Sequence, residues 1–406
     1  MSHRDLPTDA ALRALIAQAR TWQVGRRTLL QGAGASAAAL ALAACSTGGG
    51  SAKPSAPKDN SGSDKTLNWA NWAYYLDEDD DGNYPTLQAF EEESGIKVSY
   101  DVAVDDNNTY YAKVKDQLAL GQDIGADAVC LTDWMVSRLI GQGYVQKLDH
   151  ANIPNIKNLS ASLANPDFDE GRTYSLPWQS GFAGLAWNKE KLPNGLTSVE
   201  ELWDPALKGR VGVLSEMRDT IGLIMLAQGV DISGKEWGDE EFTAAIDEFQ
   251  KQVSSGQIRN IKGNSYGDDL KNEDTLAAIV WSGDVTSINA ELGEDRFGFA
   301  IPDTGGTLWS DNFVVPIGST RKGNAEALMD YYYRPEVAAT VAAYVNYITP
   351  VEGAKEAMAD IAPEYVDNPL IFPDEQTLSN AFIFRTLSNA ESTRYSAQFE
   401  SVGLGA

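Results

Sequence analysis

Histidine and cysteine are scarce in this chain of 406 residues, which contains two of each. Two cysteines, Cys45 and Cys130, cannot build a disulfide framework or a cysteine-rich zinc module. With His3 and His150 as the only imidazoles, a His-based catalytic triad and a multi-histidine metal site are both disfavoured. The sequence therefore gives little support to an enzyme that works by imidazole or thiolate chemistry.

Positive charge is also in short supply, with 32 Lys and Arg against 58 Asp and Glu and a net charge of −26. A surface that binds nucleic acid needs clustered Lys and Arg, so we expect no nucleic-acid partner. An acidic surface is compatible with a cationic ligand, although it more often serves only solubility. The hydrophobic content of 43%, with ten Trp, supports a large core and excludes global disorder.

The first 44 residues have the features of an export signal. Several arginines are followed by an apolar, Ala-rich run over residues 29–44, which is shorter than the roughly 20 residues of a membrane-spanning helix. Arg26 and Arg27 fit a twin-arginine signal, and the alternative is a Sec signal with incidental basic residues. Leu42–Cys45 resembles the bacterial lipobox, which predicts lipidation at Cys45.

We therefore divide the N-terminal region into a signal peptide, residues 1–44, and a flexible tether, residues 45–66. The tether is rich in Gly, Ser and Pro and is expected to bury nothing. Such a tether would let a globular body stand off the membrane that holds its lipid. Removal of the signal takes away five Arg and two Asp, so the net charge changes from −26 to −29.

The body alternates between strand-like and helix-like segments. Helices are expected over 85–94, about 108–120, and from residue 132 to Gly141. Strands are expected over 67–72, 95–104, 126–131, 209–214, 275–282 and 312–318. This alternation predicts α/β layers with largely parallel sheets, in which Cys130 is a core residue and Arg172–Asn188 crosses between two lobes.

Aromatic and acidic residues recur at the ends of these strands. Ligands in such architectures bind beyond the carboxyl ends of strands or between domains. Aromatic faces attract cations by roughly 0.5–2 kcal/mol each, and carboxylates bind ammonium groups by charge-assisted hydrogen bonds. The pattern predicts a cleft for a flexible organic cation with an amine at each end; the alternative is core tryptophans and helix-capping acids. The residues are Trp72, Tyr75, Thr132, Trp134, Glu216, Asp219, Trp281, Asp284, Trp309 and Asp311.

From Leu67 to about Phe399 the chain resembles the substrate-binding proteins of spermidine/putrescine ABC transporters. The motifs that carry the resemblance are Asn71–Tyr75, Ser94–Val98, Tyr174–Trp178, Glu201–Pro205, Trp281–Asp284, Trp309–Asp311, Arg334–Ala338 and Asn346–Pro350. The resemblance implies an α/β, two-lobed periplasmic-binding-protein-like (type II) fold with a hinge between the lobes. It places lobe 1 at 67–181 plus 310–353 and lobe 2 at 182–309 plus 354–406.

The resemblance also implies that the strand-end residues bind the ligand, and it adds Tyr347 as a wall residue. Two departures from the family pattern reduce the polar contacts at one end of the site. Ala73 and Tyr74 replace a hydroxyl residue and an acidic residue, and only apolar side chains stand around Phe382–Phe384. The ligand can therefore be spermidine, putrescine or another amine.

The function implied is an exported lipoprotein on the outer face of the bacterial cytoplasmic membrane. It would capture a polyamine and deliver it to an ABC permease as a monomer, without a cofactor and without covalent chemistry. One alternative is a binder of another solute, namely a metal ion, a sugar or an amino acid. Others are a secreted hydrolase using paired carboxylates such as Glu216 and Asp219, and a purely structural lipoprotein.

A short acidic run has the pattern of half a calcium loop. Asp77, Asp79 and Asp81 occupy the first, third and fifth positions, and Gly82 the sixth. The twelfth position is Gln88 rather than the bidentate Glu of an EF-hand. We therefore favour an acidic surface insertion over a calcium site.

Overall fold

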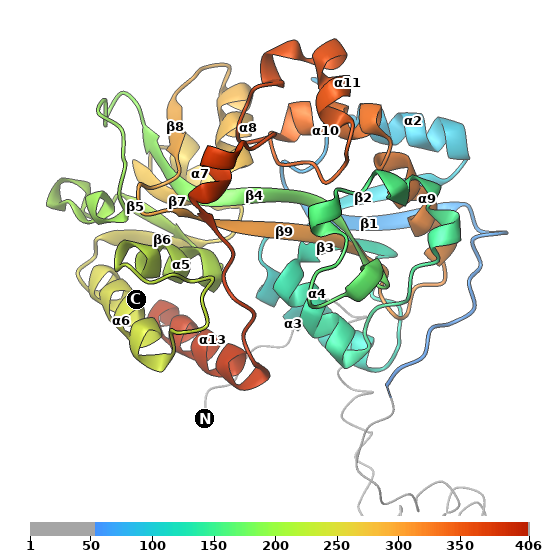
Figure 1. The fold of residues 1–406 in the computed structure, drawn as a ribbon, viewed down its shortest axis with the longest axis horizontal. Coiled ribbons are helices and arrows are strands. Elements are labelled where there is room, and N and C mark those ends of the chain that lie inside the picture. The colour runs from blue at the N-terminus through green and yellow to red at the C-terminus, as the bar shows by residue number, and fades with distance from the viewer. Residues whose placement is uncertain (1–52, 405–406) are drawn as a thin grey trace, which may run out of the picture. The chain divides into compact units, whose positions relative to one another are not determined.

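The computed structural model describes residues 53–404, which form one body (Figure 1). The expected signal peptide and the lipidation site at Cys45 lie outside the described residues. Within the described range, no helix combines the length and the apolar character needed to cross a membrane.

A single sheet of ten strands in the described range forms the centre of the body. The order along it is β2-β1-β3-β9-β4-β7-β5-β6, with β10 beside β9 and β8 beside β4. The strands are β1 (Thr66–Trp72), β2 (Lys97–Val104), β3 (Ala128–Thr132), β4 (Ser175–Asn188), β5 (Val211–Leu214), β6 (Ile258–Lys262), β7 (Ala277–Trp281), β8 (Phe297–Ala300), β9 (Gly306–Val314) and β10 (Ala381–Phe382).

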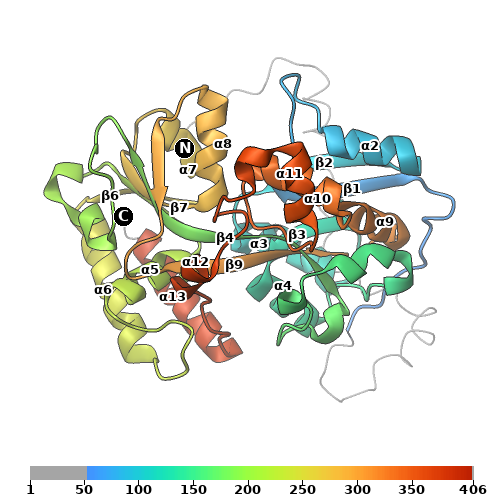
Figure 2. The ribbon, with the colours of Figure 1, turned by 45° about the horizontal axis from the view of Figure 1, so that its top comes forward.

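Helices cover the two ends of this sheet, and β4 and β9 run between them (Figures 1 and 2). α11 packs against α10 beside β1 and β2, whereas α13 packs against α6 at the other end. The body therefore has two lobes, with the two long strands as their connection. The helices are α2 (Pro85–Ser94), α3 (Asn107–Ala119), α4 (Asp133–Gln142), α5 (Met217–Ala227), α6 (Asp239–Ser254), α7 (Tyr266–Lys271), α8 (Ser282–Leu292), α9 (Lys322–Tyr332), α10 (Pro335–Val345), α11 (Ala354–Ile361), α12 (Glu375–Ser379) and α13 (Asn389–Leu404).

The prediction of parallel strands is confirmed inside each lobe and is wrong at the centre. β1 is parallel to β2 and β3, and β5 is parallel to β6 and β7. β4 and β9 are antiparallel to each other, and each joins its lobe in antiparallel fashion, β9 to β3 and β4 to β7. The expected crossing segment Arg172–Asn188 contains β4.

The strand expected at 312–318 is misplaced, because β9 covers Gly306–Val314. β9 pairs with β4 from Thr307 to Val314, and Pro316 stands two residues beyond its end. Trp309 and Asp311 consequently lie inside a strand instead of at its beginning. The polar residues in the middle of β9 lie where the strand crosses between the lobes.

Aromatic packing anchors the first lobe to the crossing strands. The Trp69 side chain is fully buried in β1. Its ring centroid lies 4.9 to 5.6 Å from those of Tyr100, Trp178, Phe313 and Tyr332. Such pairs contribute about 0.5–1.5 kcal/mol each beyond the area they bury. Cys130, a free and buried thiol in β3, is confirmed as a core residue of the same lobe.

Part of the expected tether lies on the body. The backbone N–H of Asn60 donates to the carbonyl of Thr320 (2.7 Å), and that of Asn324 donates to the Ser61 hydroxyl (3.0 Å). The Lys53 ammonium donates to the carbonyl of Gly141 (2.9 Å). Ser61 is buried. The expectation that this stretch buries nothing is therefore wrong for residues 53–65, because polar side chains satisfy backbone groups near the start of α9.

The two edge strands of the sheet meet at their carboxyl ends. Asp105 directly follows β2, and it accepts backbone N–H bonds from Asn264 (3.3 Å) and Ser265 (2.9 Å), which follow β6. A Cβ atom on Gly263 would lie 1.8 Å from the Asp105 carbonyl oxygen. Since β2 and β6 stand at opposite ends of the strand order, the sheet curls until the lobes touch, and a glycine makes that contact possible.

Gly263→Ala is expected to push these two edges apart, because the added carbon meets a backbone carbonyl that cannot rotate away. Small-angle scattering should give a larger radius of gyration than for the wild type. The Tm should fall by less than about 4 °C, since the core of each lobe is unchanged. Gly141→Ala is the control, because a Cβ there meets nothing within 4 Å. Identical scattering from both variants would contradict the proposed contact.

Candidate ligand-binding site

All eleven predicted ligand-binding residues line one cavity. It encloses about 620 Å³ of space not filled by atoms, including solvent at its mouth. Trp72, Thr132 and Trp281 are the last residues of β1, β3 and β7, because the carboxyl ends of parallel strands gather at one edge. The complete set is Trp72, Tyr75, Thr132, Trp134, Glu216, Asp219, Trp281, Asp284, Trp309, Asp311 and Tyr347.

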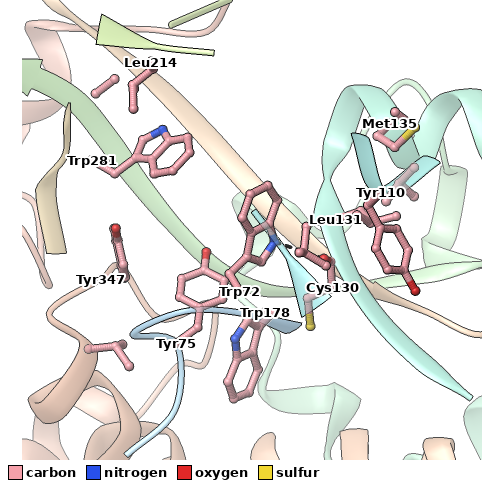
Figure 3. Close-up of a cluster of buried hydrophobic side chains, with 14 of the residues drawn as sticks. Trp72, Tyr75, Tyr110, Cys130, Leu131, Met135, Trp178, Leu214, Trp281 and Tyr347 are labelled. Carbon is pink, nitrogen blue, oxygen red and sulfur yellow. Dashed lines mark hydrogen bonds between the residues drawn. The ribbon is translucent and has the colours of Figure 1, made fainter. Parts of the chain in front are cut away.

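The aromatic residues form a connected wall. Trp72 meets Trp281 edge to face with ring centroids 5.9 Å apart, and Trp281 meets Trp309 at 6.4 Å. Tyr347 contacts Trp309 at 5.2 Å and Tyr75 at 5.3 Å. Figure 3 shows four of these five side chains, Trp72, Tyr75, Trp281 and Tyr347, close to one another. Edge-to-face contacts fix the orientation of each ring before a ligand arrives.

Two of the carboxylates are held entirely by neutral donors. Asp219 accepts from the indole N–H of Trp281 (2.8 Å) and the Thr307 hydroxyl (2.5 Å). Burial raises the pKa of Asp219 to about 6, against the effect of these two hydrogen bonds. Asp219 thus fixes the Trp281 ring without an ion pair of its own, and the nearby charge of Arg218 also opposes the rise in its pKa.

Asp284, in the first turn of α8, is likewise hydrogen-bonded only by neutral donors. It accepts from the hydroxyls of Tyr347 (2.6 Å) and Tyr266 (2.8 Å) and from the Asn264 amide (2.9 Å). Burial raises the pKa of Asp284 to about 6, although all three donors lower it.

Asp311 keeps one oxygen atom free. Its Oδ2 accepts from the Tyr75 hydroxyl (2.9 Å), whereas the buried Oδ1 has no hydrogen-bond partner among the described residues. Burial raises the pKa of Asp311 to about 7, and the hydroxyls of Thr132 and Tyr75 oppose that rise. The indole N–H of neighbouring Trp309 is likewise buried without a partner in the described range. Asp311 is therefore the carboxylate best prepared to accept a hydrogen bond from a ligand.

Glu216 is the one cavity carboxylate in the described range with an ion pair. Its Oε1 lies 3.6 Å from an Arg218 guanidinium nitrogen and accepts the Arg218 backbone N–H (3.2 Å). Its Oε2 makes only a long contact with the Asn107 amide (3.5 Å). Burial raises the pKa of Glu216 to about 8, and the charge of Arg218 opposes that rise.

These acids also lie at helix N-termini, as the alternative interpretation of the sequence pattern expects. Glu216 is the N-cap of α5, and Asp219 and Asp284 lie in the first turns of α5 and α8. A position at a helix N-terminus stabilises a carboxylate by the helix dipole. Capping and lining the cavity are therefore compatible, because both helices begin at the strand ends that face it.

Several residues of the site were missed by sequence reasoning. Asp133 and Arg218 adjoin predicted residues, so their positions carried a signal. Asn264 and Thr307 were missed because β6 and the first half of β9 were not recognised as strands. Ala73, Ile383 and Phe384 also line the cavity and belong to the segments expected at one end of the site. The remaining lining residues are Asn107, Asp133, Arg218, Asn264, Thr307 and Leu308.

Tyr74, which replaces the acidic residue of the family pattern, does not line the cavity. Its φ of 55° is unusual for a residue other than glycine. Its hydroxyl donates to Glu291 (3.1 Å) and accepts from Lys271 (3.1 Å). The side chain thus joins the end of β1 to α7 and α8 at the rim of the cleft.

The three acids of the candidate calcium loop do not gather around one point. Asp77 is buried and accepts from the backbone N–H of Thr86 (2.9 Å) and from its hydroxyl. Asp79 accepts from the backbone N–H groups of Asp81 (3.0 Å) and Asn83 (2.8 Å). Within the range the structure describes, no group of three or more His, Cys, Asp or Glu could hold a metal ion.

A rigid, aromatic and acidic cavity between two lobes joined by crossing strands is the arrangement of a solute-binding protein. The sequence profile of the bacterial extracellular solute-binding proteins matches residues 86–373. The chain belongs to this family.

Curated relatives and solved structures extend the comparison. The chain is 28% identical over 316 residues to a spermidine/putrescine-binding periplasmic protein of Escherichia coli, covering 78% of this chain and 85% of that one. It is 26% identical to the putrescine-binding periplasmic protein PotF of the same organism, covering 79% and 86%. A structure from Listeria monocytogenes, described as a spermidine/putrescine ABC transporter, superposes with a TM-score of 0.72 at 25% identity, covering 84% and 100%.

The buried carboxylates predict how stability changes with pH. The folded protein holds protons on them more tightly than the unfolded chain does, so the free energy of unfolding should fall as pH rises. For Asp311 the fall spans pH 3.8 to about 7, and a rise of about three pKa units corresponds to at most about 4 kcal/mol.

Asp311→Asn should therefore flatten the decrease of Tm between pH 4.5 and 7.5 in ligand-free protein. Asp360→Asn, at an exposed position of α11, is the control and should follow the wild-type curve. Parallel curves for all three proteins would show that Asp311 is not protonated in the fold.

Proposed function

We propose that this protein captures a polyamine of the putrescine/spermidine class in the cavity and delivers it to an ABC permease. The observation that carries the proposal is Asp311, a buried carboxylate with a free oxygen, which lines the cavity together with Trp309. A buried charge of this kind is costly unless a cation compensates it. The polyamine-binding relatives support the same class of ligand.

The alkyl chain of the ligand would lie between Trp72, Trp281 and Trp309, and its ammonium groups would be shared among the acids. Aromatic rings fit this cargo because they bury methylenes on their faces and attract cations at the same time. The carboxylates have different roles. Asp311 offers a free oxygen that can accept a hydrogen bond from the ligand, while Asp219 and Asp284 contribute negative electrostatic potential. The acids in question are Glu216, Asp219, Asp284 and Asp311.

Closure of the lobes would be the signal that the permease recognises. The contact between Asp105 and Gly263 joins the two edges of the sheet next to Asn107 and Asn264, which line the cavity. A ligand that bridges acids of both lobes would favour the state in which this contact forms. The lobe limits 67–181 plus 310–353 and 182–309 plus 354–406 are part of this proposal, except that α11 goes with lobe 1, because it packs against α10.

We further propose that the protein works outside the cytoplasm. Lipidation at Cys45 would anchor the chain on the outer face of the cytoplasmic membrane after export by a twin-arginine or Sec signal. The protein would act as a monomer and perform no covalent chemistry. Other solutes fit less well, because a sugar calls for neutral amides, and the lining contributes only Asn107 and Asn264 of that kind.

Asp311→Asn should weaken polyamine binding by about 10²-fold or more, because a desolvated ammonium loses its charged partner. Isothermal titration calorimetry with putrescine and spermidine at pH 7.5 measures the loss. Asp360→Asn is again the control for charge alone. Polyamine binding of unchanged strength in Asp311→Asn would sink the site assignment, and binding of sugars or amino acids in place of polyamines would sink the proposed function.

Binding should also release protons. An ammonium group stabilises an ionised carboxylate, and the pKa of about 7 for Asp311 leaves that side chain partly protonated at pH 6.5 without ligand. Affinity should therefore rise between pH 6 and pH 8. Calorimetry at pH 6.5 in buffers of different ionisation enthalpy counts the released protons. Fewer protons are expected from Asp311→Asn, and an equal count would refute the assignment of that proton.

A further inference from the structure

Arg218 is the one Lys, Arg or His among the described residues that line the cavity. It lies in the first turn of α5, and its side chain is 12% exposed. The guanidinium carbon lies 4.1 Å from the ring centroid of Trp134, and a guanidinium nitrogen lies 3.6 Å from Glu216. A cation of the protein itself therefore stands between an aromatic ring and a carboxylate of the site.

This position has the chemistry of an ammonium site. A cation over an aromatic ring and beside a carboxylate gains from both the ring quadrupole and the opposite charge. The same chemistry at Trp309 and Asp311 contains no protein cation, since no Lys or Arg nitrogen of the described residues lies within 4.0 Å of the Asp311 carboxylate. The position between Trp134 and Glu216 is thus already occupied by the guanidinium of Arg218. The position at Trp309 and Asp311 is available to a cation of the ligand.

The charges in the cavity divide into two groups. Burial raises the pKa of Asp133 and Asp219, and the charge of Arg218 opposes that rise, as it does for Glu216. Asp284 and Asp311 have hydroxyl and amide donors as their partners and no ion pair in the described range. Two buried carboxylates are therefore left without a counter-charge.

Arg218 also lies at the boundary with the solvent. It lines a wide outer groove that adjoins the cavity and contains Arg138 and Ser392. Arg138 lies 5.4 Å from the Trp134 ring and donates to the Ser392 hydroxyl of α13 (3.4 Å). A ligand long enough to extend from Asp311 to the mouth would bring its outer ammonium against Arg218.

We propose that Arg218 determines specificity by filling the outermost cation position of the cavity, so that the protein prefers a diamine to a triamine. The inference rests on the proposed function and goes beyond it by choosing within the polyamine class. A diamine supplies two charges for Asp284 and Asp311. The third charge of spermidine would be placed beside a fixed guanidinium, and juxtaposed like charges are a means of rejecting a ligand.

The test is the ratio of the affinities for putrescine and spermidine, measured by calorimetry. The wild type should favour putrescine, and Arg218→Gln should shift the ratio toward spermidine by about tenfold, equivalent to about 1.4 kcal/mol. Arg218→Lys keeps the charge and should keep the preference. Arg138→Gln, which removes a cation from the outer groove, should leave the ratio at its wild-type value.

A second measurement needs no variant. Monoacetylated spermidine has the length of spermidine or more but two positive charges, so the wild type should bind it more tightly than spermidine if charge is what Arg218 rejects. Weaker binding of the acetylated ligand would show that length is limiting and would overturn the inference. So would a wild type that favours spermidine, or an unchanged ratio in Arg218→Gln. A wild type that binds neither amine refutes the proposed function itself.

Discussion

The burial of several carboxylates around one cavity is the constraint on which the rest of this structure depends. Taking an ionised carboxylate out of water is expensive, and the fold offsets the cost with hydroxyl, amide and indole donors. Tyr75, Tyr347 and Thr307 each donate to one of these acids while standing in the cavity wall. The network therefore positions the aromatic rings and holds the acids with the same hydrogen bonds. Neutral donors leave the negative charge in place, so the site remains complementary to a cation.

The crossing strands explain how groups from two lobes form one rigid surface. β4 and β9 pair over most of their length, and β9 carries Trp309 and Asp311 through the middle of the body. Gly181 in β4 lies opposite Trp309, and a Cβ there would lie 2.6 Å from that ring and 2.7 Å from Tyr347. The absence of a side chain at this point lets two wall residues reach the centre. Sites supported by paired strands are held more rigidly than sites on loops.

Sequence reasoning located the site because parallel strands place their carboxyl ends together. Trp72, Thr132 and Trp281 were found in this way. An error of two residues in the predicted end of a strand would still have placed them at this edge of the sheet. β9 was misplaced for a physical reason: Ser310 and Asp311 are typical of a turn, and only the three-dimensional fold shows a cavity beside the strand. β6 was missed because its sequence Ile-Arg-Asn-Ile-Lys has few apolar residues. Some of these carboxylates have all their oxygens hydrogen-bonded and others keep one free. This difference depends on partners that are distant in sequence, such as Tyr347 and Asp284, so no local sequence pattern encodes it.

Arg218 shows how such a site can be stable and selective at once. Glu216 would otherwise be a further buried carboxylate without a cation, so an internal guanidinium reduces the cost of forming the cavity. Each internal cation also removes one position at which a ligand can bind by charge. The number of carboxylates left uncompensated then sets the charge of the preferred ligand, while the length of the aromatic wall sets its extent. Changing the charge count and changing the wall length are therefore separable routes to a different specificity on the same fold.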